Sequence, residues 1–251
     1  MRAMAGTRRL AASAAASVLA GIHYYQTHAQ SSCQSYPQGH REELMAKAAE
    51  RIHRAERVVA FTGAGISAAS GIPTYRDAFK ADGLWDGLYG QLALLVFGTK
   101  IGFLFLPTAA WRHYCERLLL PISRAQPNAG HLSLAALCDF VITQNIDGLH
   151  QRSAEASGAP VRQRHVYELH GTCMTHRHSW TGCAVEVDTA RLDPSSPPAL
   201  FTRPDIVLFF EGMPAAFWHA ASLISDLGKG DVLPRMLLIV GCSESLTQHE
   251  H

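Results

Sequence analysis

The sequence predicts an α/β fold, a doubly wound parallel Rossmann-like sheet that carries a short inserted small module. Short apolar and β-branched runs alternate with helical segments from residue 41 onward, which is typical of parallel βαβ units. Polar residues directly follow several of these runs, as expected where parallel strands end. Residues 171–202, rich in His, Ser and Pro, interrupt the alternation. We interpret that segment as the inserted module.

The predicted elements can be followed along the chain. Residues 41–57 show helical spacing with acidic residues in the first turn, and 58–62 form a short apolar strand that ends at Gly63. Asn128 is a candidate N-cap for a helix. Pro214 suits the first turn of a helix over 214–227. Four further strands are predicted at 140–145, 166–171, 205–210 and 235–241.

The apolar stretch over residues 88–111 has two interpretations. A membrane-spanning helix needs about 20 predominantly apolar residues. Here Lys100 and three glycines interrupt the run, and Pro107 ends it. We therefore expect a buried or pocket-lining helical segment rather than a membrane span.

Composition limits the classes of function. The chain has 251 residues, of which 47% are hydrophobic and 17% charged, enough for one or two domains with a real core. The formal net charge of +1 gives no field that favours nucleic acid. Six scattered cysteines indicate a reducing compartment.

Residues 1–40 differ from the rest, because no acidic residue precedes Glu42 and three arginines lie among Ala and Ser. This composition is typical of a mitochondrial transit peptide. A secretory signal and a disordered leader are the alternatives, so we expect a mitochondrial protein, with the cytoplasm or the secretory pathway left open.

Candidate site residues fall at the carboxyl ends of the predicted strands. They are Gly63-Ala64-Gly65, Gln144-Asn145-Ile146-Asp147, His170 and Gly241-Cys242-Ser243. The glycines allow a backbone to approach a diphosphate, although a tight turn without a ligand is the alternative. Asn145 and Asp147 can also form a simple Asx turn. His170 suits either a satisfied core histidine or a general base.

Four stretches in this order resemble the sirtuins, which are NAD-dependent protein-lysine deacylases: "GAGISAASGIPTYRD", "TQNIDGLH", "ELHG" and "RPDIVLFFEGMP". The resemblance covers about residues 42 to 246. It implies a catalytic domain over 41–251 in which 171–202 is a reduced small module. The family pattern continues past "IVGCSES", so we expect the domain to be incomplete at its C-terminal end, with a low thermal midpoint and weak NAD binding.

The resemblance also implies a mechanism. The acyl oxygen of the substrate lysine attacks the ribose of NAD as nicotinamide leaves, and His170 then acts as general base, with Asn145 and Asp147 beside the nicotinamide and ribose. The products are nicotinamide, deacylated lysine and O-acyl-ADP-ribose. The implied cofactor-binding residues are Gly63, Ala64, Gly65, Ile66, Tyr75, Arg76, Asp77, Gln144, Gly241 and Ser243.

Tyr114 and Arg117 bear on the acyl group. Their Y-x-x-R spacing resembles the sirtuins that remove succinyl, malonyl or glutaryl groups. Residues three apart share a helix face, and an Arg can bind a carboxylate with two hydrogen bonds. An ordinary amphipathic helix with an exposed Arg is the alternative.

Two features of the sequence depart from the family pattern. Sirtuins usually carry two C-x-x-C pairs, whereas this insertion has only Cys173 and Cys183 with His176 and His178 between them. A closed tetrahedral site needs four well-placed ligands, so we expect no structural zinc. Phe210 replaces the Gly of the family's F-G-E, and its bulk is expected to hinder the approach of a substrate peptide.

The predicted function is therefore an NAD-dependent protein-lysine deacylase, a transferase of acyl groups to ADP-ribose. The expected partners are acylated lysines on proteins, without nucleic acid or membrane, and the oligomeric state stays open. Protein ADP-ribosyl transfer and an inactive NAD-binding module are the alternatives.

Overall fold

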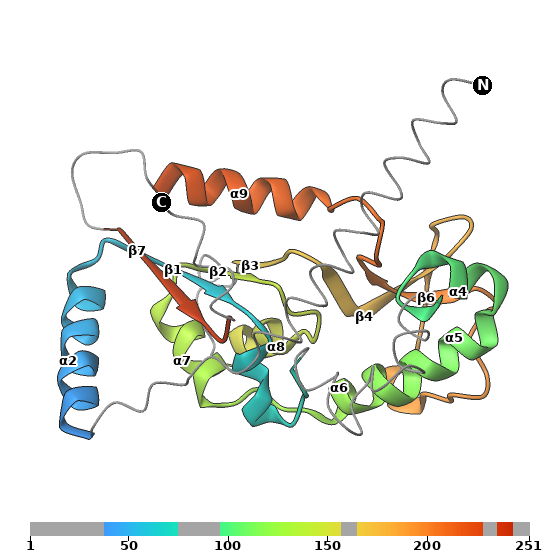
Figure 1. Cartoon of the computed structure of the whole chain (residues 1–251), viewed down its shortest axis with the longest axis horizontal. Helices are drawn as coiled ribbons and strands as arrows, with labels where there is room; N and C mark the ends of the chain where they lie inside the picture. The colour runs from blue at the N-terminus through green and yellow to red at the C-terminus, as the bar shows by residue number, and fades with distance from the viewer. Residues whose placement is uncertain (1–37, 75–95, 157–164, 228–234, 243–251) are drawn as a thin grey trace, which may run out of the picture. The chain divides into compact units, whose positions relative to one another are not determined.

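The computed structural model describes residues 38–74, 96–156, 165–227 and 235–242 (Figure 1). The chain divides into two compact units, residues 1–46 and 47–251, and the second unit contains both sheets. The predicted leader lies almost entirely outside the described residues. Helix α2 (Gln38–Arg54) begins three residues before its predicted start, so the acidic residues fall outside its first turn.

The main sheet confirms the predicted parallel fold. Its order is β3-β2-β1-β7, and all three pairings are parallel. The strands are β1 (Arg57–Thr62), β2 (Phe140–Thr143), β3 (His165–Glu168) and β7 (Arg235–Val240). The last residues of all four strands lie side by side in register: Thr62 opposite Thr143 and Val240, and Thr143 opposite Glu168. The residues that follow each strand are therefore brought to one edge of the sheet.

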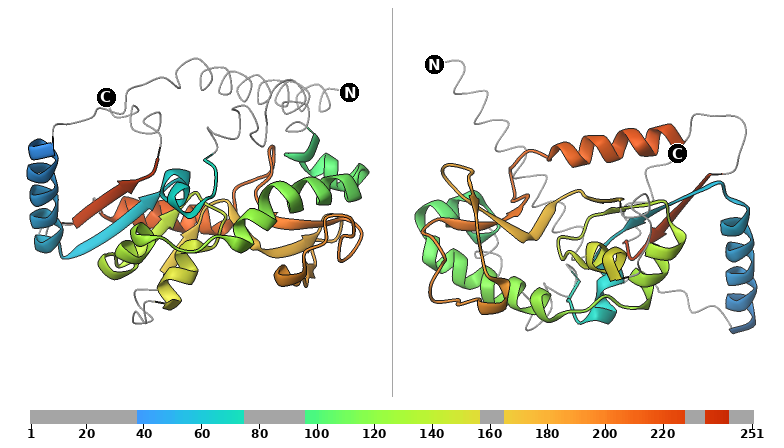
Figure 2. Two further views of the ribbon diagram at one scale, coloured as in Figure 1. Left: turned by 90° about the horizontal axis from the view of Figure 1, so that it is seen from below. Right: turned by 180° about the vertical axis from the view of Figure 1, so that it is seen from behind.

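Helices cover both faces of this sheet. Alternate side chains of a strand point to opposite faces. On one face, Val58, Ala60 and Val141 pack with Leu134 of α7 (Ala129–Leu137). On the other, Val59, Phe140 and Ile142 pack with Ala220 of α9 (Ala215–Leu227). Figures 1 and 2 show α9 and α7 on opposite sides of the strands.

Helix α7 starts at the predicted N-cap. The Asn128 Oδ1 accepts hydrogen bonds from the Gly130 N–H at 2.9 Å and the His131 N–H at 3.4 Å. In return the His131 Nδ1 accepts a hydrogen bond from the Asn128 N–H at 3.3 Å. This reciprocal cap satisfies backbone donors that the helix cannot pair internally. It also fixes the ring of His131, which matters for the site.

The inserted module is a second, antiparallel sheet with the order β5-β4-β6. It is made of β4 (Gly171–His178), β5 (Ala184–Val185) and β6 (Thr202–Ile206). The prediction of a parallel-sheet strand over 205–210 is wrong, because β6 begins earlier and pairs with β4. Ile206 and Leu208 are instead buried in the module's core. An apolar run indicates burial, but it does not identify the partner strand.

The segment before β2 packs on this module. It contains α4 (Lys100–Phe105), α5 (Pro107–Tyr114), the π-turn η3 (Cys115–Leu119) and α6 (Leu120–Arg124). Pro107 separates α4 from α5 and stands where its missing N–H is not needed. Phe103 and Trp111 are buried in the core, whereas Ile101 and Phe105 are exposed, so the predicted burial holds only in part. Residues 75–95 lie outside the described parts.

Three short elements complete the described fold: the 3-10 helix η1 (Ala64–Ser70), helix α8 (Leu149–Ala156) and the 3-10 turn η5 (Thr189–Arg191). Within the described ranges, no helix is both long enough and apolar enough to cross a membrane.

Candidate active site

The glycines after β1 are required by a close contact with the end of β7. The Gly63 N–H donates to the Val240 O at 3.0 Å, and the Gly65 N–H donates to the Gly241 O at 2.9 Å. A Cβ on Gly63 or Gly65 would lie 2.8 Å from the Gly241 O. Gly241 itself has a φ of +68°, and a Cβ there would lie 2.3 Å from the Ile66 N. The contact agrees with the tight turn that the sequence analysis kept as an alternative to a diphosphate site, although the closeness of Gly241 could not be predicted.

A buried hydroxyl, Ser67 of η1, joins the residues that follow β2. The Ser67 Oγ donates to the Asp147 Oδ2 at 2.7 Å and accepts from the Asn145 Nδ2 at 3.0 Å. It also lies 3.5 Å from the His131 Nε2. We call Ser67, Asn145, Asp147 and His131 the Ser67 network. All four side chains are buried, so the network is rigid and nearly shielded from water.

Asn145 and Asp147 make further bonds that orient them. The Asn145 Nδ2 donates to the Gly63 O at 3.2 Å, which ties β2 to the glycine turn. The Asp147 Oδ1 accepts from the Leu149 N–H at 2.9 Å, next to the start of α8. The Asx-type turn and the polar site are thus both present, and one does not exclude the other.

His170 lies two residues beyond β3 and is half-buried. Its Nδ1 is 2.9 Å from the Gln144 O. A carbonyl oxygen can only accept, so Nδ1 carries the proton and Nε2 keeps a lone pair. This tautomer is the one that a general base needs.

Two histidines that the sequence interpretation missed stand behind the site. The His150 Nε2 lies 2.9 Å from the Thr62 Oγ1, and the rings of His131 and His150 are 4.8 Å apart. Burial lowers the pKa of His150 to about 3 and also lowers the pKa of His131. Both are therefore neutral at pH 7, and His131 donates from Nε2 because its Nδ1 is the acceptor in the cap.

Glu168, the last residue of β3, is a carboxyl group beside this edge. Burial raises its pKa to about 7, although hydrogen bonds from Thr172 and Gln151 oppose the shift. The sequence interpretation did not single it out. It shares the strand end that leads to His170.

The structure places Tyr114 and Arg117 in different surroundings. Tyr114 ends α5 and is only 6% exposed in the module's core, where burial raises the pKa of its hydroxyl. Arg117 is exposed within the π-turn η3. A π-turn changes the angular step between residues, so α-helical spacing no longer applies.

Tyr75, Arg76, Asp77 and Ser243 lie outside the described residues. Their predicted contacts with NAD therefore stay predictions. The remaining predicted residues, Gly63 to Ile66, Gln144, Asn145, Asp147, His170 and Gly241, all follow the aligned strand ends.

The structure places the four candidate zinc ligands in different surroundings. Cys173 is buried in the apolar core, which raises the pKa of its thiol well above the ordinary value and disfavours the thiolate. Cys183 is exposed. His176 packs against Trp111, and the His178 Nδ1 accepts from two backbone N–H groups. Across the described ranges, no group of three or more His, Cys, Asp or Glu residues could hold a metal ion.

Comparison with known proteins agrees with this geometry. The sequence profile of the Sir2 family matches residues 63–247. The NAD-dependent protein deacylase of Ralstonia nicotianae is 35% identical over 178 residues, which are 67% of this chain and 65% of that protein. The deacylase of Pseudomonas putida is 35% identical over 228 residues, 79% of this chain and 81% of that protein.

Solved structures show the same relationship. A Sir2 homologue in complex with NAD has a TM-score of 0.58 at 29% identity, covering 79% of this chain and 72% of its own. Sir2Tm bound to a propionylated peptide has a TM-score of 0.54 at 27% identity, covering 79% of this chain and 75% of its own. The chain belongs to the Sir2 family, the sirtuins that its motifs resemble, and is a homologue of NAD-dependent protein deacylases.

Proposed function

We propose that this chain is an NAD-dependent protein-lysine deacylase whose general base is His170. The observation that carries the proposal is the bond from the His170 Nδ1 to the Gln144 O at 2.9 Å. It leaves the Nε2 lone pair for catalysis, at the strand edge where the Ser67 network also lies. The NAD and propionylated-peptide complexes of solved homologues support both substrates.

NAD supplies an acceptor for the acyl group: the acyl oxygen of the lysine bonds to the ribose carbon as the bond to nicotinamide breaks. Asn145 and Asp147 are buried and fixed by Ser67, so they orient the ribose and nicotinamide without reorganising. His170 Nε2 then removes the proton of a ribose hydroxyl, which makes that oxygen a nucleophile toward the acyl carbon. Water completes the release of lysine and O-acyl-ADP-ribose.

The proposed NAD site includes the turn at Gly63, Ala64, Gly65 and Ile66, with Gln144 and Gly241 beside it. Ala64 is half-buried and Gly65 exposed, so the turn keeps a surface for a ligand even though its N–H at Gly65 is bonded internally. Tyr75, Arg76, Asp77 and Ser243 complete the proposed site.

The preference for acidic acyl groups rests on Arg117 alone. Its guanidinium is exposed and can meet a carboxylate with two hydrogen bonds. Tyr114 is assigned to packing in the module's core.

The substitution His170→Ala tests the role of the base. Deacylation of acyl-lysine peptides, followed by mass spectrometry, should fall by about 100-fold or more. Exchange of labelled nicotinamide into NAD should persist, because breaking and remaking that bond precedes the base step. Full deacylation by His170→Ala, or equal loss of both rates in a folded variant, would contradict the assignment. Label transfer from NAD to protein without acyl turnover would instead select the ADP-ribosyltransferase alternative.

A further inference from the structure

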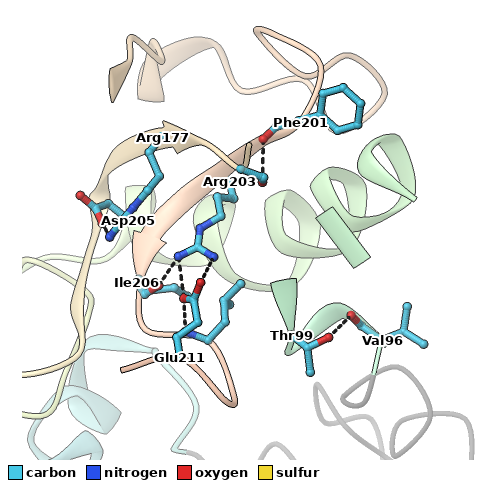
Figure 3. Close-up of polar contacts among 10 residues, drawn as sticks. Val96, Thr99, Arg177, Phe201, Arg203, Asp205, Ile206 and Glu211 are labelled. Carbon is cyan, nitrogen blue, oxygen red and sulfur yellow. Dashed lines mark hydrogen bonds and ion pairs between the residues drawn. The ribbon is translucent and has the colours of Figure 1, made fainter. Parts of the chain in front are cut away.

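An ion pair between buried Arg203 and half-buried Glu211 closes the loop that follows β6. The Arg203 Nη1 and Nη2 each donate to one carboxylate oxygen of Glu211, both at 2.7 Å (Figure 3). The Arg203 side chain is 3% exposed and the Glu211 side chain 26%. Such a two-pronged pair has a defined geometry as well as a favourable energy.

The same two side chains also bind the loop backbone. The Arg203 Nη2 donates to the Ile206 O at 3.0 Å, and the Glu211 Oε2 accepts from the Leu208 N–H at 3.1 Å. The Glu211 N–H in turn donates to the Leu208 O at 3.0 Å. Residues 207–211, which we call the 207–211 loop, are thus held at both ends by one ion pair.

The 207–211 loop reaches two other parts of the molecule. The Val207 N–H donates to the His170 O at 2.8 Å. The Phe209 N–H donates to the Gly98 O at 2.9 Å, and Phe209 forms a parallel bridge with Thr99. The backbone of His170 is therefore held by the loop, while its ring is held by the Gln144 O.

We propose that Arg203 and Glu211 are positioning residues for His170, acting through the 207–211 loop and the bond from Val207. The inference rests on the proposed function, because it assigns His170 the role of base. Loss of the pair would loosen the loop and shift His170 relative to the ribose hydroxyl. Small displacements of a catalytic group have large effects on rate.

Glu211→Gln tests this inference in the full chain. Deacylation should fall by roughly tenfold to 100-fold, with nicotinamide exchange reduced by about twofold or less, because only the second step uses His170. General loss of folding would lower both rates together. In hydrogen exchange, the amide of Val207 should become less protected.

Two further variants make the result interpretable. Arg203→Lys keeps the charge but loses the two-pronged geometry, so it should show the same difference between the two rates in a weaker form. It replaces Glu211→Gln as the test if Glu211→Gln fails to fold. Asp205→Asn is the matched control. It removes the ion pair between Asp205, which lies on β6 like Arg203, and Arg177 of β4 (Figure 3). Both side chains are about 40% exposed, and among the described residues neither makes a hydrogen bond to the 207–211 loop. Both rates should stay unchanged.

Equal loss of both rates in folded Glu211→Gln, or unchanged protection of the Val207 amide, would overturn the inference. A wild-type chain with neither rate would contradict the deacylase proposal instead. In that case, the amide protection alone would decide whether the pair holds the loop.

Discussion

His170, His131 and His150 share a residue type but have different partners. The His170 ring is half-buried with one nitrogen on a carbonyl, so its second nitrogen can take up a proton. His131 and His150 are buried against each other and against hydroxyl groups, and burial lowers their pKa values. They serve as neutral supports of the site, with His131 donating toward Ser67.

At the residue scale, Arg117→Met tests the acyl preference. If the exposed guanidinium binds the acyl carboxylate, removal of succinyl groups should fall by about tenfold or more, because a charge-assisted pair is worth about 1.5–3 kcal/mol. Removal of acetyl groups should stay unchanged. Parallel reactions on matched succinyl- and acetyl-lysine peptides measure the ratio. Equal effects on both peptides would mean that Arg117 does not bind the acyl carboxylate. The substitution Arg112→Met, at a neighbouring exposed arginine, is the control.

Sequence reasoning selected candidate residues that directly follow strands and did not select the residues of η1, α7 and α8 that contact them. Asn145, Asp147 and His170 were predicted because parallel strands end at a common edge. Ser67, His131 and His150 reach the same place from η1, α7 and α8. Their contacts depend on how the helices cross the sheet. Only the position of Ser67, just after the glycine turn, was a usable signal.

At the element scale, Phe210 carries backbone strain within the 207–211 loop. Its φ is +70°, a region that costs a non-glycine residue roughly 1–2 kcal/mol, and its side chain is 58% exposed. The side chain therefore gains little from packing to offset the strain. The Phe210 side chain thus lies on the surface of the loop, at the position where the family's F-G-E pattern has Gly.

Phe210→Gly should stabilise the protein by up to about 1 kcal/mol, since the relief of strain exceeds the added entropy of a glycine in the unfolded chain. Urea unfolding measures the change. Phe210→Ala is the matched control, because it removes the same aromatic ring but keeps the Cβ that causes the strain. Destabilisation by Phe210→Gly, or equal stabilisation by both variants, would contradict the strain argument.

At the scale of the whole molecule, burial makes stability depend on pH. Burial lowers the pKa of His113 to about 4, of His150 to about 3 and of His176 to about 4. An unfolded His titrates near 6.5, so below pH 6.5 the unfolded chain binds more protons at these three groups. Glu168 acts in the opposite direction, because its raised pKa of about 7 lets the folded state bind an extra proton between pH 4.5 and 7.

Three histidines outweigh one carboxyl group, so the free energy of unfolding should fall as pH drops from 6.5 to about 4. Urea midpoints measured across this range test the prediction. His150→Gln should show a shallower pH dependence, whatever its stability at pH 7. Stability that is constant or increases on acidification would contradict the assigned burial of these rings.

The parallel sheet was predictable from sequence because its apolar runs are short, separated by helices and buried on both faces. The extent of the inserted module was not predictable from sequence. Strand β6 and its apolar continuation resemble another core strand, and only the antiparallel pairing with β4 shows that they belong to the module. The aligned strand ends bring the candidate site residues together, and the bond from the Val207 N–H to the His170 O joins the module to them.

The most direct measurement follows the acyl group itself. Acetyl- and succinyl-lysine peptides labelled at the acyl carbonyl are incubated with NAD and the full chain, and all products are resolved by mass spectrometry. The deacylase account predicts one labelled O-acyl-ADP-ribose for each nicotinamide and each free lysine formed. Intact peptide with ADP-ribose attached to protein, or free labelled acid formed without consumption of NAD, would contradict it.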